Sequence, residues 1–306
     1  GDVYKRQLQG RQNDLWGPEL LAAPLGWGRF ADRGEFWDAW DLAANYPDQP
    51  LPFQWAQGPE LLEQGPLCTR LRWQGRCGQS PISLVISLQA ASPILELTLQ
   101  TQWRQCHELL RCQVPLAQPG GFWAADCAAG VQERPSQPRT PREASRWECP
   151  ALSWVAGGTA SAGLALLLDG PQGVNGSATG LGVSLLRGPT WPDPSADQGL
   201  QRLRLGLMAA PGGWCQALVP AAAAAFRQPP WQRPAAPGPC QRQELLPWPN
   251  PHLQLLALEK SELPGSLVIK GQNLSPYRGQ WPGPTKPWQL GRWTLERPAP
   301  AAFQSS

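Results

Sequence analysis

Residues 82–103 read ISLVISLQAASPILELTLQTQW, and this stretch decides the fold class. Apolar side chains recur in it at every second position: Ile82, Leu84, Ile86 and Leu88, then Leu95, Leu97 and Leu99. Period-two alternation is typical of strands that bury one face, so we predict two strands here. Ser92 and Pro93 supply the turn between them, since proline cannot continue a central strand.

The strand pattern continues on both sides of this stretch. Residues 67–73 alternate in the same way and predict an antiparallel meander of three strands. Apolar runs at 162–168, 181–187 and 200–208 predict more strands, whereas only the alanine-rich segment 221–226 favours a helix. Because so many half-buried sheet faces must pack on one another, we expect an all-β fold built on a large antiparallel β-sandwich.

The chain is expected to contain two β-domains joined by a linker. The large sandwich is assigned to residues 8–228, within which 8–34 read as a polar lead-in and 118–146 as a loop-rich insert. Residues 229–251 are rich in proline and are interpreted as the linker. Residues 252–306 are assigned to a small C-terminal β-domain, with strands at 253–258, 266–269 and 289–295.

The first seven residues look foreign to the protein. Residues 2–7, Asp-Val-Tyr-Lys-Arg-Gln, are the translation of a common transposase-derived sequencing adapter. We interpret residues 1–7 as a library scar and expect the natural protein to continue upstream of residue 8. A natural N-terminus at residue 1 is the alternative.

Composition argues against several functional classes. The net charge is +3 and the basic residues are scattered, so no nucleic-acid surface is expected. There is no run of 18 apolar residues, so no membrane span is expected either. The eight cysteines form no CxxC pair and only two histidines occur, which argues against a structural zinc site. With no secretory signal sequence in view, we expect free thiols and a cytoplasmic protein.

Spacing alone reveals no catalytic motif. Two carboxylate pairs stand out, Asp38 with Asp41 and Asp193 with Asp197. Glycosidase carboxylates flank a substrate and lie about 5 Å or more apart, so these sequence neighbours are interpreted as structural. Trp37 directly precedes Asp38, and Trp40 directly precedes Asp41. They are candidate sugar contacts, with core packing as the alternative.

Several segments together resemble glycoside hydrolase family 38 α-mannosidases. They are FWDAWD at 36–41 with Tyr46, EQGPL at 63–67, Trp103 with HELL at 107–110, VQERP at 131–135 with WECPA at 147–151, and PWQL at 287–290. The strongest match is SLLRGPTWPDP at 184–194, continuing to Gly199. The resemblance runs in order over about residues 15–297.

The resemblance implies that this chain is the C-terminal β region of a larger enzyme, with a sandwich of the galactose-mutarotase-like supersandwich type. In that family a preceding catalytic domain carries the zinc ion and the nucleophile of a retaining α-mannosidase. The family's zinc-ligand motif, His-Asp-x-x-x-Gly-Thr, does not occur here. We therefore expect no catalytic residue and no metal in this chain, and zinc only in the complete enzyme.

The implied partners are a mannose-containing oligosaccharide and the chain's own N-terminal catalytic domain, with homo-oligomers as in the family. The alternative is a non-catalytic carbohydrate-binding or scaffold module.

Site residues follow from the same resemblance. The loop from Asp169 to Gly176 corresponds to one that lies near the sugar in the family, so Asp169 and Asn175 are candidate substrate contacts. The family often has Lys and Tyr where this chain has Pro171 and Gln172, which puts the polar contacts of this loop in question. Structural roles are expected for Asp38, Trp40, Asp41, Asp193 and Asp197. Arg187 is expected to pair with Asp193 or Asp197.

Overall fold

The computed structural model describes residues 9–12, 15–34, 36–90, 92–228 and 248–296. The chain divides into two compact units, Gly1–Cys127 with Val131–Val219, and Ala128–Gly130 with Pro220–Ser306. The first seven residues and the segment 229–247 of the expected linker lie outside the described residues.

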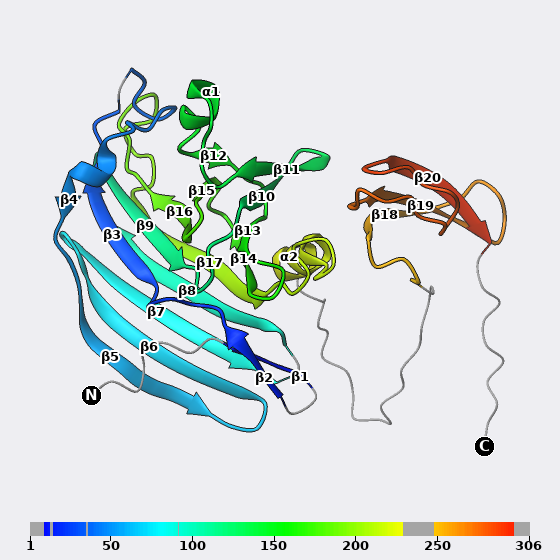
Figure 1. Ribbon diagram of the computed structural model, residues 1–306, viewed down its shortest axis with the longest axis horizontal. Coiled ribbons are helices and arrows are strands. Elements are labelled where there is room, and N and C mark those ends of the chain that lie inside the picture. The colour runs from blue at the N-terminus through cyan, green and yellow to red at the C-terminus, as the bar shows by residue number, and fades with distance from the viewer. Residues whose placement is uncertain (1–8, 13–14, 35, 91, 229–247, 297–306) are drawn as a thin grey trace. The chain divides into compact units, whose positions relative to one another are not determined.

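The first unit is built on a nine-stranded sheet (Figure 1). Its strands, in spatial order, are β11 (Gly130–Pro135), β10 (Phe122–Cys127), β13 (Trp154–Gly158), β14 (Gly163–Asp169), β17 (Gly199–Ala209), β8 (Ile94–Trp103), β7 (Ser80–Gln89), β6 (Cys68–Cys77) and β5 (Phe53–Gln64). The predicted meander is confirmed, because β6, β7 and β8 pair antiparallel in sequence order, with Leu84 opposite Leu99.

A six-stranded sheet forms the second layer of this unit (Figure 1). Its order is β12 (Cys149–Pro150), β15 (Gly173–Gly176), β16 (Gly180–Leu186), β9 (Glu108–Pro115), β3 (Gly26–Ala31) and β4 (Pro50–Leu51). One hydrophobic cluster joins the sheets, with Leu97 and Leu99 from the first and Leu110, Val114 and Val183 from the second. The predicted β-sandwich is thereby confirmed, since each sheet buries its apolar face on the other.

Two segments differ from their predicted form. The insert at 118–146 contains strands β10 and β11, followed by a short helix α1 (Pro141–Ala144). The lead-in contains β1 (Gln9–Gln12), β2 (Leu15–Glu19) and β3, and 3-10 helix η1 (Tyr46–Asp48) follows it. The buried run Trp123–Ala125 and the glycine-rich β3 show no period-two alternation, so their strand character was not visible in the sequence.

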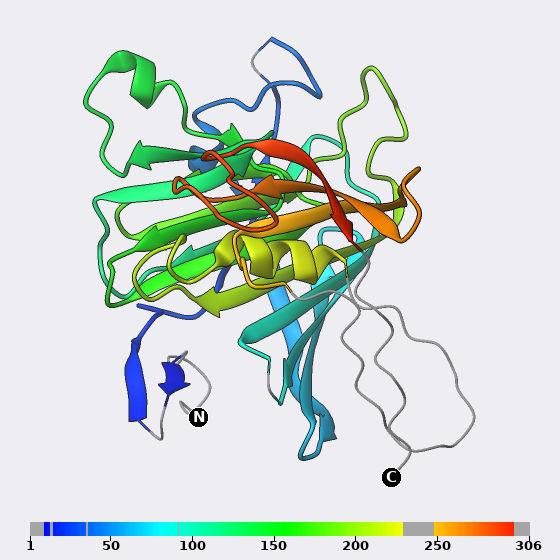
Figure 2. The same cartoon turned by 90° about the vertical axis from the view of Figure 1, so that its right-hand side faces the viewer.

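The second unit holds a three-stranded antiparallel sheet in the order β18 (Leu253–Lys260), β19 (Ser266–Asn273) and β20 (Leu290–Glu296) (Figure 2). All three strands were predicted, and Val268 and Ile269 are its buried centre. The predicted helix is α2 (Val219–Arg227), most of which falls in this unit. Within the described ranges, no helix has the length and apolarity of a membrane span.

Candidate functional site

A dense polar network lies at the end of the six-stranded sheet where strand β16 ends. Arg187 follows β16, and its Nε and Nη2 donate to the two carboxylate oxygens of Asp32 at 2.5 and 3.0 Å. The same guanidinium donates to the backbone carbonyls of Asp38, Ala39 and Asp41. Arg187 therefore holds the FWDAWD loop (residues 36–41) against the ends of strands β16 and β3.

Two carboxylates complete the fastening from inside the loop. Asp38 Oδ2 accepts the backbone N–H groups of Thr190 and Trp191 at 2.8 and 2.9 Å. Asp41 Oδ2 accepts those of Phe36 and Trp37 at 2.7 and 2.9 Å. Charge-assisted bonds to backbone N–H are stronger than neutral ones, so both carboxylates hold backbone geometry.

The predicted partner of Arg187 was wrong. Asp197 accepts the backbone N–H groups of Arg187 and Gly188, and its carboxylate does not carry the ion pair. Asp193 lies exposed and caps Ser195. The strand order explains this pairing. Strand β9 lies between β16 and β3 and is antiparallel to both, so the C-terminal ends of β16 and β3 lie on either side of the start of β9. Arg187, just after β16, and Asp32, just after β3, therefore lie close together. Sequence proximity had favoured the nearer carboxylates.

His107 joins the network below the loop. Its Nε2 lies 3.0 Å from Asp38 Oδ1, and the same nitrogen lies 3.3 Å from Thr190 Oγ1. A hydroxyl–imidazole–carboxylate relay needs the two partners on opposite ring nitrogens. Because both contacts here use Nε2, this arrangement does not support a nucleophilic threonine.

The pKa of Asp38 is lowered by its partners. Burial alone would raise the pKa of this carboxyl, but the hydrogen bond from His107 and those from the backbone N–H groups of Thr190 and Trp191 outweigh it. The resulting pKa is about 2. Asp38 is therefore an anion at any physiological pH, which suits an acceptor of hydrogen bonds and not a general acid.

Four aromatic side chains stand exposed above this network: Phe36, Trp37, Trp40 and Trp191. The ring centroids of Trp40 and Trp191 lie 5.0 Å apart, edge to face, and those of Trp37 and Trp191 lie 6.5 Å apart. We call Trp37, Trp40 and Trp191, whose rings contact one another, the aromatic cluster. Trp40, predicted to be structural, thus contributes to a surface and not to the core.

A second polar network is buried on the outer face of the same sheet. Arg111 in β9 is 0% exposed, and its Nη1 donates to Glu148 at 2.7 Å and to Ser184 at 2.9 Å. Its Nη2 donates to Asn175 Oδ1 at 2.9 Å, and Tyr46 lies under the guanidinium. The carbonyl oxygen of the candidate sugar contact Asn175 is therefore engaged within the protein.

The other candidate sugar contact belongs to the other sheet. Asp169 ends β14, and its Oδ2 accepts a hydrogen bond from Arg204 Nη1 of β17 at 2.8 Å. Arg204 also contacts Glu96 of β8. Asp169 and Asn175 thus have different partners in different sheets.

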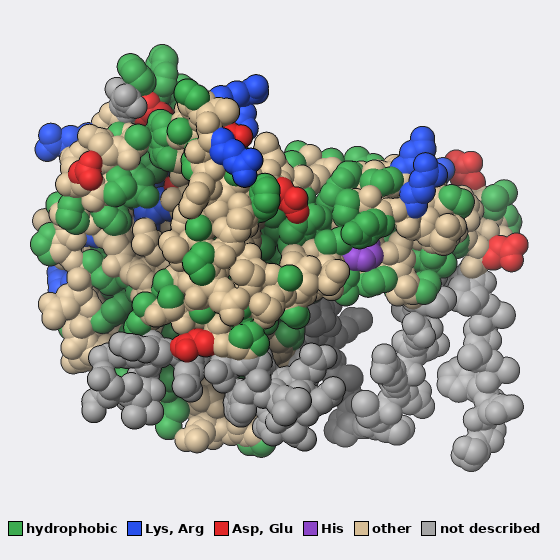
Figure 3. All heavy atoms as spheres, viewed as in Figure 1, with side chains coloured by type: hydrophobic (Ala, Val, Ile, Leu, Met, Phe, Trp, Pro, Cys, Tyr) green, Lys and Arg blue, Asp and Glu red, His purple; other side chains and the backbone are tan. Residues whose placement is uncertain are grey.

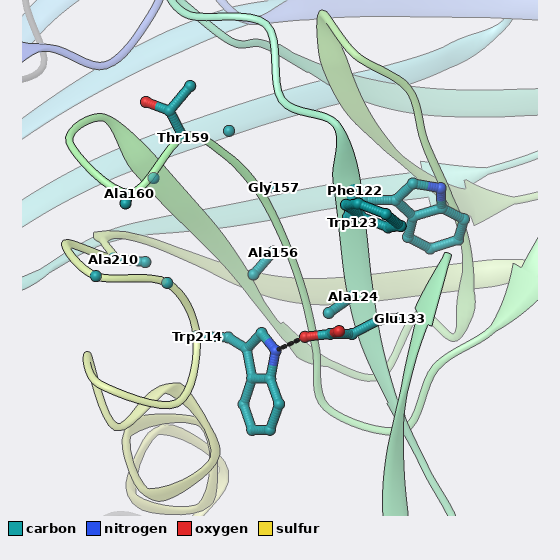
Figure 4. A pocket seen from close by; sticks show the side chains of 14 residues that line it. Phe122, Trp123, Ala124, Glu133, Ala156, Gly157, Thr159, Ala160, Ala210 and Trp214 are labelled. Atoms are coloured by element: carbon teal, nitrogen blue, oxygen red, sulfur yellow. Dashed lines mark hydrogen bonds between the residues drawn. The ribbon is translucent and has the colours of Figure 1, made fainter. Parts of the chain in front are cut away.

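A separate pocket lies in the first unit (Figure 4). Its empty volume is about 480 Å³, and small residues such as Gly157, Gly163 and Ala210 line it. Trp214 forms one wall and donates from Nε1 to Glu133 at 2.8 Å. None of its lining residues was predicted from the sequence as a site residue.

No metal centre takes shape in the described part of the chain: no three His, Cys, Asp or Glu side chains come together there. Asp38 and His107 are a pair without a third ligand in that range. The described residues therefore do not fit a zinc ion, which needs at least three protein ligands. Lys and Arg side chains are scattered over the face in Figure 3 and form no basic stripe.

Sequence reasoning missed Asp32, Arg111 and Glu148, and gave His107 no role. Asp32 could have been found by reading 26–31 as a strand whose end meets the end of 181–187. Nothing in the sequence pattern marks Arg111, because a buried arginine is unusual and its partners come from three distant segments.

The comparisons with known proteins agree with one another. The family model for the glycosyl hydrolases family 38 C-terminal domain matches residues 15–195. The chain is 26% identical to Alpha-mannosidase 2C1 of Homo sapiens over 239 residues, which are 76% of this chain and 23% of that protein. It is 27% identical to Alpha-mannosidase G of Dictyostelium discoideum over 176 residues, 56% of this chain and 16% of that protein.

The chain thus spans less than a quarter of the length of these curated relatives. Among solved structures, that of an alpha-mannosidase from Enterococcus faecalis V583 covers 92% of this chain with a TM-score of 0.69 and 14% identity. This chain covers 39% of that one. The likeness shows a shared fold.

Proposed function

The chain belongs to the family of the glycosyl hydrolases family 38 C-terminal domain, and from this we propose that it is the C-terminal portion of an α-mannosidase. In this proposal the complete enzyme is zinc-dependent and retaining, acts in the cytoplasm, and removes terminal α-D-mannosyl residues from mannose-containing oligosaccharides. The observation that carries the proposal is the match of residues 15–195 to the family.

The catalytic groups are proposed to belong to an N-terminal domain that precedes this chain in the parent protein. A retaining glycosidase needs a nucleophile and an acid/base about 5–5.5 Å apart. The three carboxylates nearest Arg187 are committed to hydrogen bonds with the protein: Asp32 with Arg187, Asp38 with the backbone of Thr190, and Asp41 with the backbone of Phe36. This suits a structural role and not nucleophilic attack. When bound in that domain, zinc would supply a Lewis acid for sugar hydroxyls.

This chain is proposed to support the catalytic domain and border its sugar site. Arg187, Asp32, Asp38 and Asp41 keep the FWDAWD loop in one conformation. Asp169 and Asn175 stay proposed sugar contacts, each through polar atoms beyond those that bind Arg204 and Arg111.

The test is to read the genomic frame upstream of residue 8 and to express that segment with and without this chain. We expect an upstream frame of several hundred residues with zinc-ligand motifs, and hydrolysis of an aryl α-mannoside only when both parts are present. When this chain carries Arg187→Gln, the two parts together should hydrolyse the aryl α-mannoside more slowly than they do with the parent sequence. Hydrolysis by this chain alone, with bound zinc, would overturn the proposal.

A second candidate is a carbohydrate-binding or scaffold module without catalysis. The exposed aromatic cluster favours it, since such surfaces stack on sugar rings. It requires a start codon directly before residue 8, so the same genomic frame separates the two candidates.

A further inference from the structure

The aromatic cluster exposes a large apolar surface. Trp40 is 66% exposed, Trp37 57% and Trp191 51%, and Phe36, next to Trp37 in the sequence, is 80% exposed. Single exposed apolar residues are ordinary, but contiguous ones mark interaction sites, since burying them is favourable. Two segments more than a hundred residues apart, 36–40 and 191, contribute to this one surface, so local sequence does not explain it.

The cluster is rigidly mounted. The backbone N–H of Trp37 is bound by Asp41, and that of Trp191 is bound by Asp38. Arg187 holds the carbonyls of residues 38, 39 and 41. Binding to a preorganised surface costs little ordering entropy, which suits a small, weakly held ligand.

Polar groups lie at the base of the cluster. The side chain of His107 is 43% exposed, and within the described residues its hydrogen bonds run through Nε2, which leaves Nδ1 for a ligand. Asp38 is anionic, and its Oδ1 contacts His107. Because a carboxylate oxygen has two lone pairs, Oδ1 can accept a further hydrogen bond. Apolar faces beside an imidazole and a carboxylate fit a ligand with an apolar face and hydroxyl groups at its rim.

We propose that Trp37, Trp40 and Trp191, with Asp38 and His107 at their base, form a pyranose-binding subsite. The C–H face of the ring packs on an indole face, and its hydroxyls bond to Asp38 and His107. A purely apolar protein contact would cover the partly exposed imidazole of His107 without a partner for its Nδ1, so the sugar is the better occupant. The choice of a mannoside as the ring rests on the proposed function.

The test titrates the 306-residue chain with methyl α-D-mannopyranoside and an α-linked mannobiose. Binding is followed by tryptophan fluorescence and by saturation-transfer NMR. We expect saturable binding in the millimolar range, tighter for the disaccharide. Trp191→Ala should weaken binding about tenfold, as expected for one lost aromatic contact. Trp191→Phe keeps an aromatic ring, so its affinity should lie between those of the parent chain and Trp191→Ala.

Phe122→Ala is the matched control, because Phe122 is an exposed aromatic outside the cluster, and it should bind as the parent chain does. Equal melting temperatures establish that each variant is folded. No saturation at tens of millimolar mannoside overturns the subsite, as does equal binding by Trp191→Ala. Self-association abolished by Trp40→Ala, without any sugar effect, would identify a protein-contact surface instead. If this chain binds the sugar but does not hydrolyse it, the subsite is supported. The activity of the parent enzyme is decided separately, by the complementation test.

Discussion

The guanidinium of Arg187 pairs with the carboxylate of Asp32, which lies 155 residues earlier in the chain, through two hydrogen bonds of 2.5 and 3.0 Å. The Asp32 side chain is only 3% exposed. A bidentate arginine–carboxylate pair of this kind fixes both position and orientation. This pair also positions the FWDAWD loop, since the same guanidinium donates to three backbone carbonyls of that loop.

Removing this arginine should destabilise the first unit. Arg187→Gln leaves the buried Asp32 carboxylate without its cation, and breaking a buried pair costs roughly 3–5 kcal/mol. Urea denaturation measures the loss. Arg202→Gln is the control, because Arg202 is an exposed arginine in β17, and it should change the free energy of unfolding by less than about 0.5 kcal/mol. Equal stability of the two variants would refute the anchoring role.

The stability of the first unit should fall in acid partly through Asp38. Its folded pKa of about 2 lies below the ordinary aspartate value near 3.9. A depressed pKa stabilises the folded state above the ordinary value, and this contribution is lost as pH falls from about 4 towards 2. Asp38→Asn cannot titrate, so its stability should depend less on pH in that window. Parallel pH profiles for both proteins would contradict this.

Asp169 carries two separable expectations. Its ion pair with Arg204 is partly exposed, so the coupling energy in a double-mutant cycle of Asp169→Asn with Arg204→Gln should be about 1 kcal/mol or less. The sugar contact stays a prediction: in the complete enzyme, Asp169→Asn should raise KM about tenfold or more, and Arg204→Gln should not. If both variants shift KM equally, Asp169 acts only through its ion pair.

The cysteines should react in two classes. Burial raises the pKa of Cys77 and of Cys112 to about 12, so neither forms a thiolate near neutral pH. Cys106 and Cys127 are exposed. An aromatic disulfide reagent should modify these two before Cys77 and Cys112, as peptide mass mapping would show, and should reach Cys77 and Cys112 only after denaturant is added. Rapid native labelling of Cys112 would show that the core opens.

The strands with strong alternation were predictable, because a half-buried strand must repeat its apolar positions every two residues. That rule located β6, β7, β8, β17 and the small sheet. It failed for β10, which is buried on consecutive positions, and for β3, whose glycines give no pattern. In β3 the ring of Phe30 occupies the space that a side chain at Gly28 would need.

The sequence by itself determined the β-rich class, the family resemblance and the presence of the FWDAWD and SLLRGPTWPDP segments. Only the tertiary structure decided which charges meet: Arg187 with Asp32, Asp38 with His107, and Arg111 with Glu148. The physical reason is that the order of the strands and the alignment of their ends determine which charged side chains meet. Neither can be read from the spacing of residues along the sequence. A pairing across β9 joins residues that no short-range pattern relates, and Trp191 comes to lie beside Trp37 and Trp40 in one exposed surface.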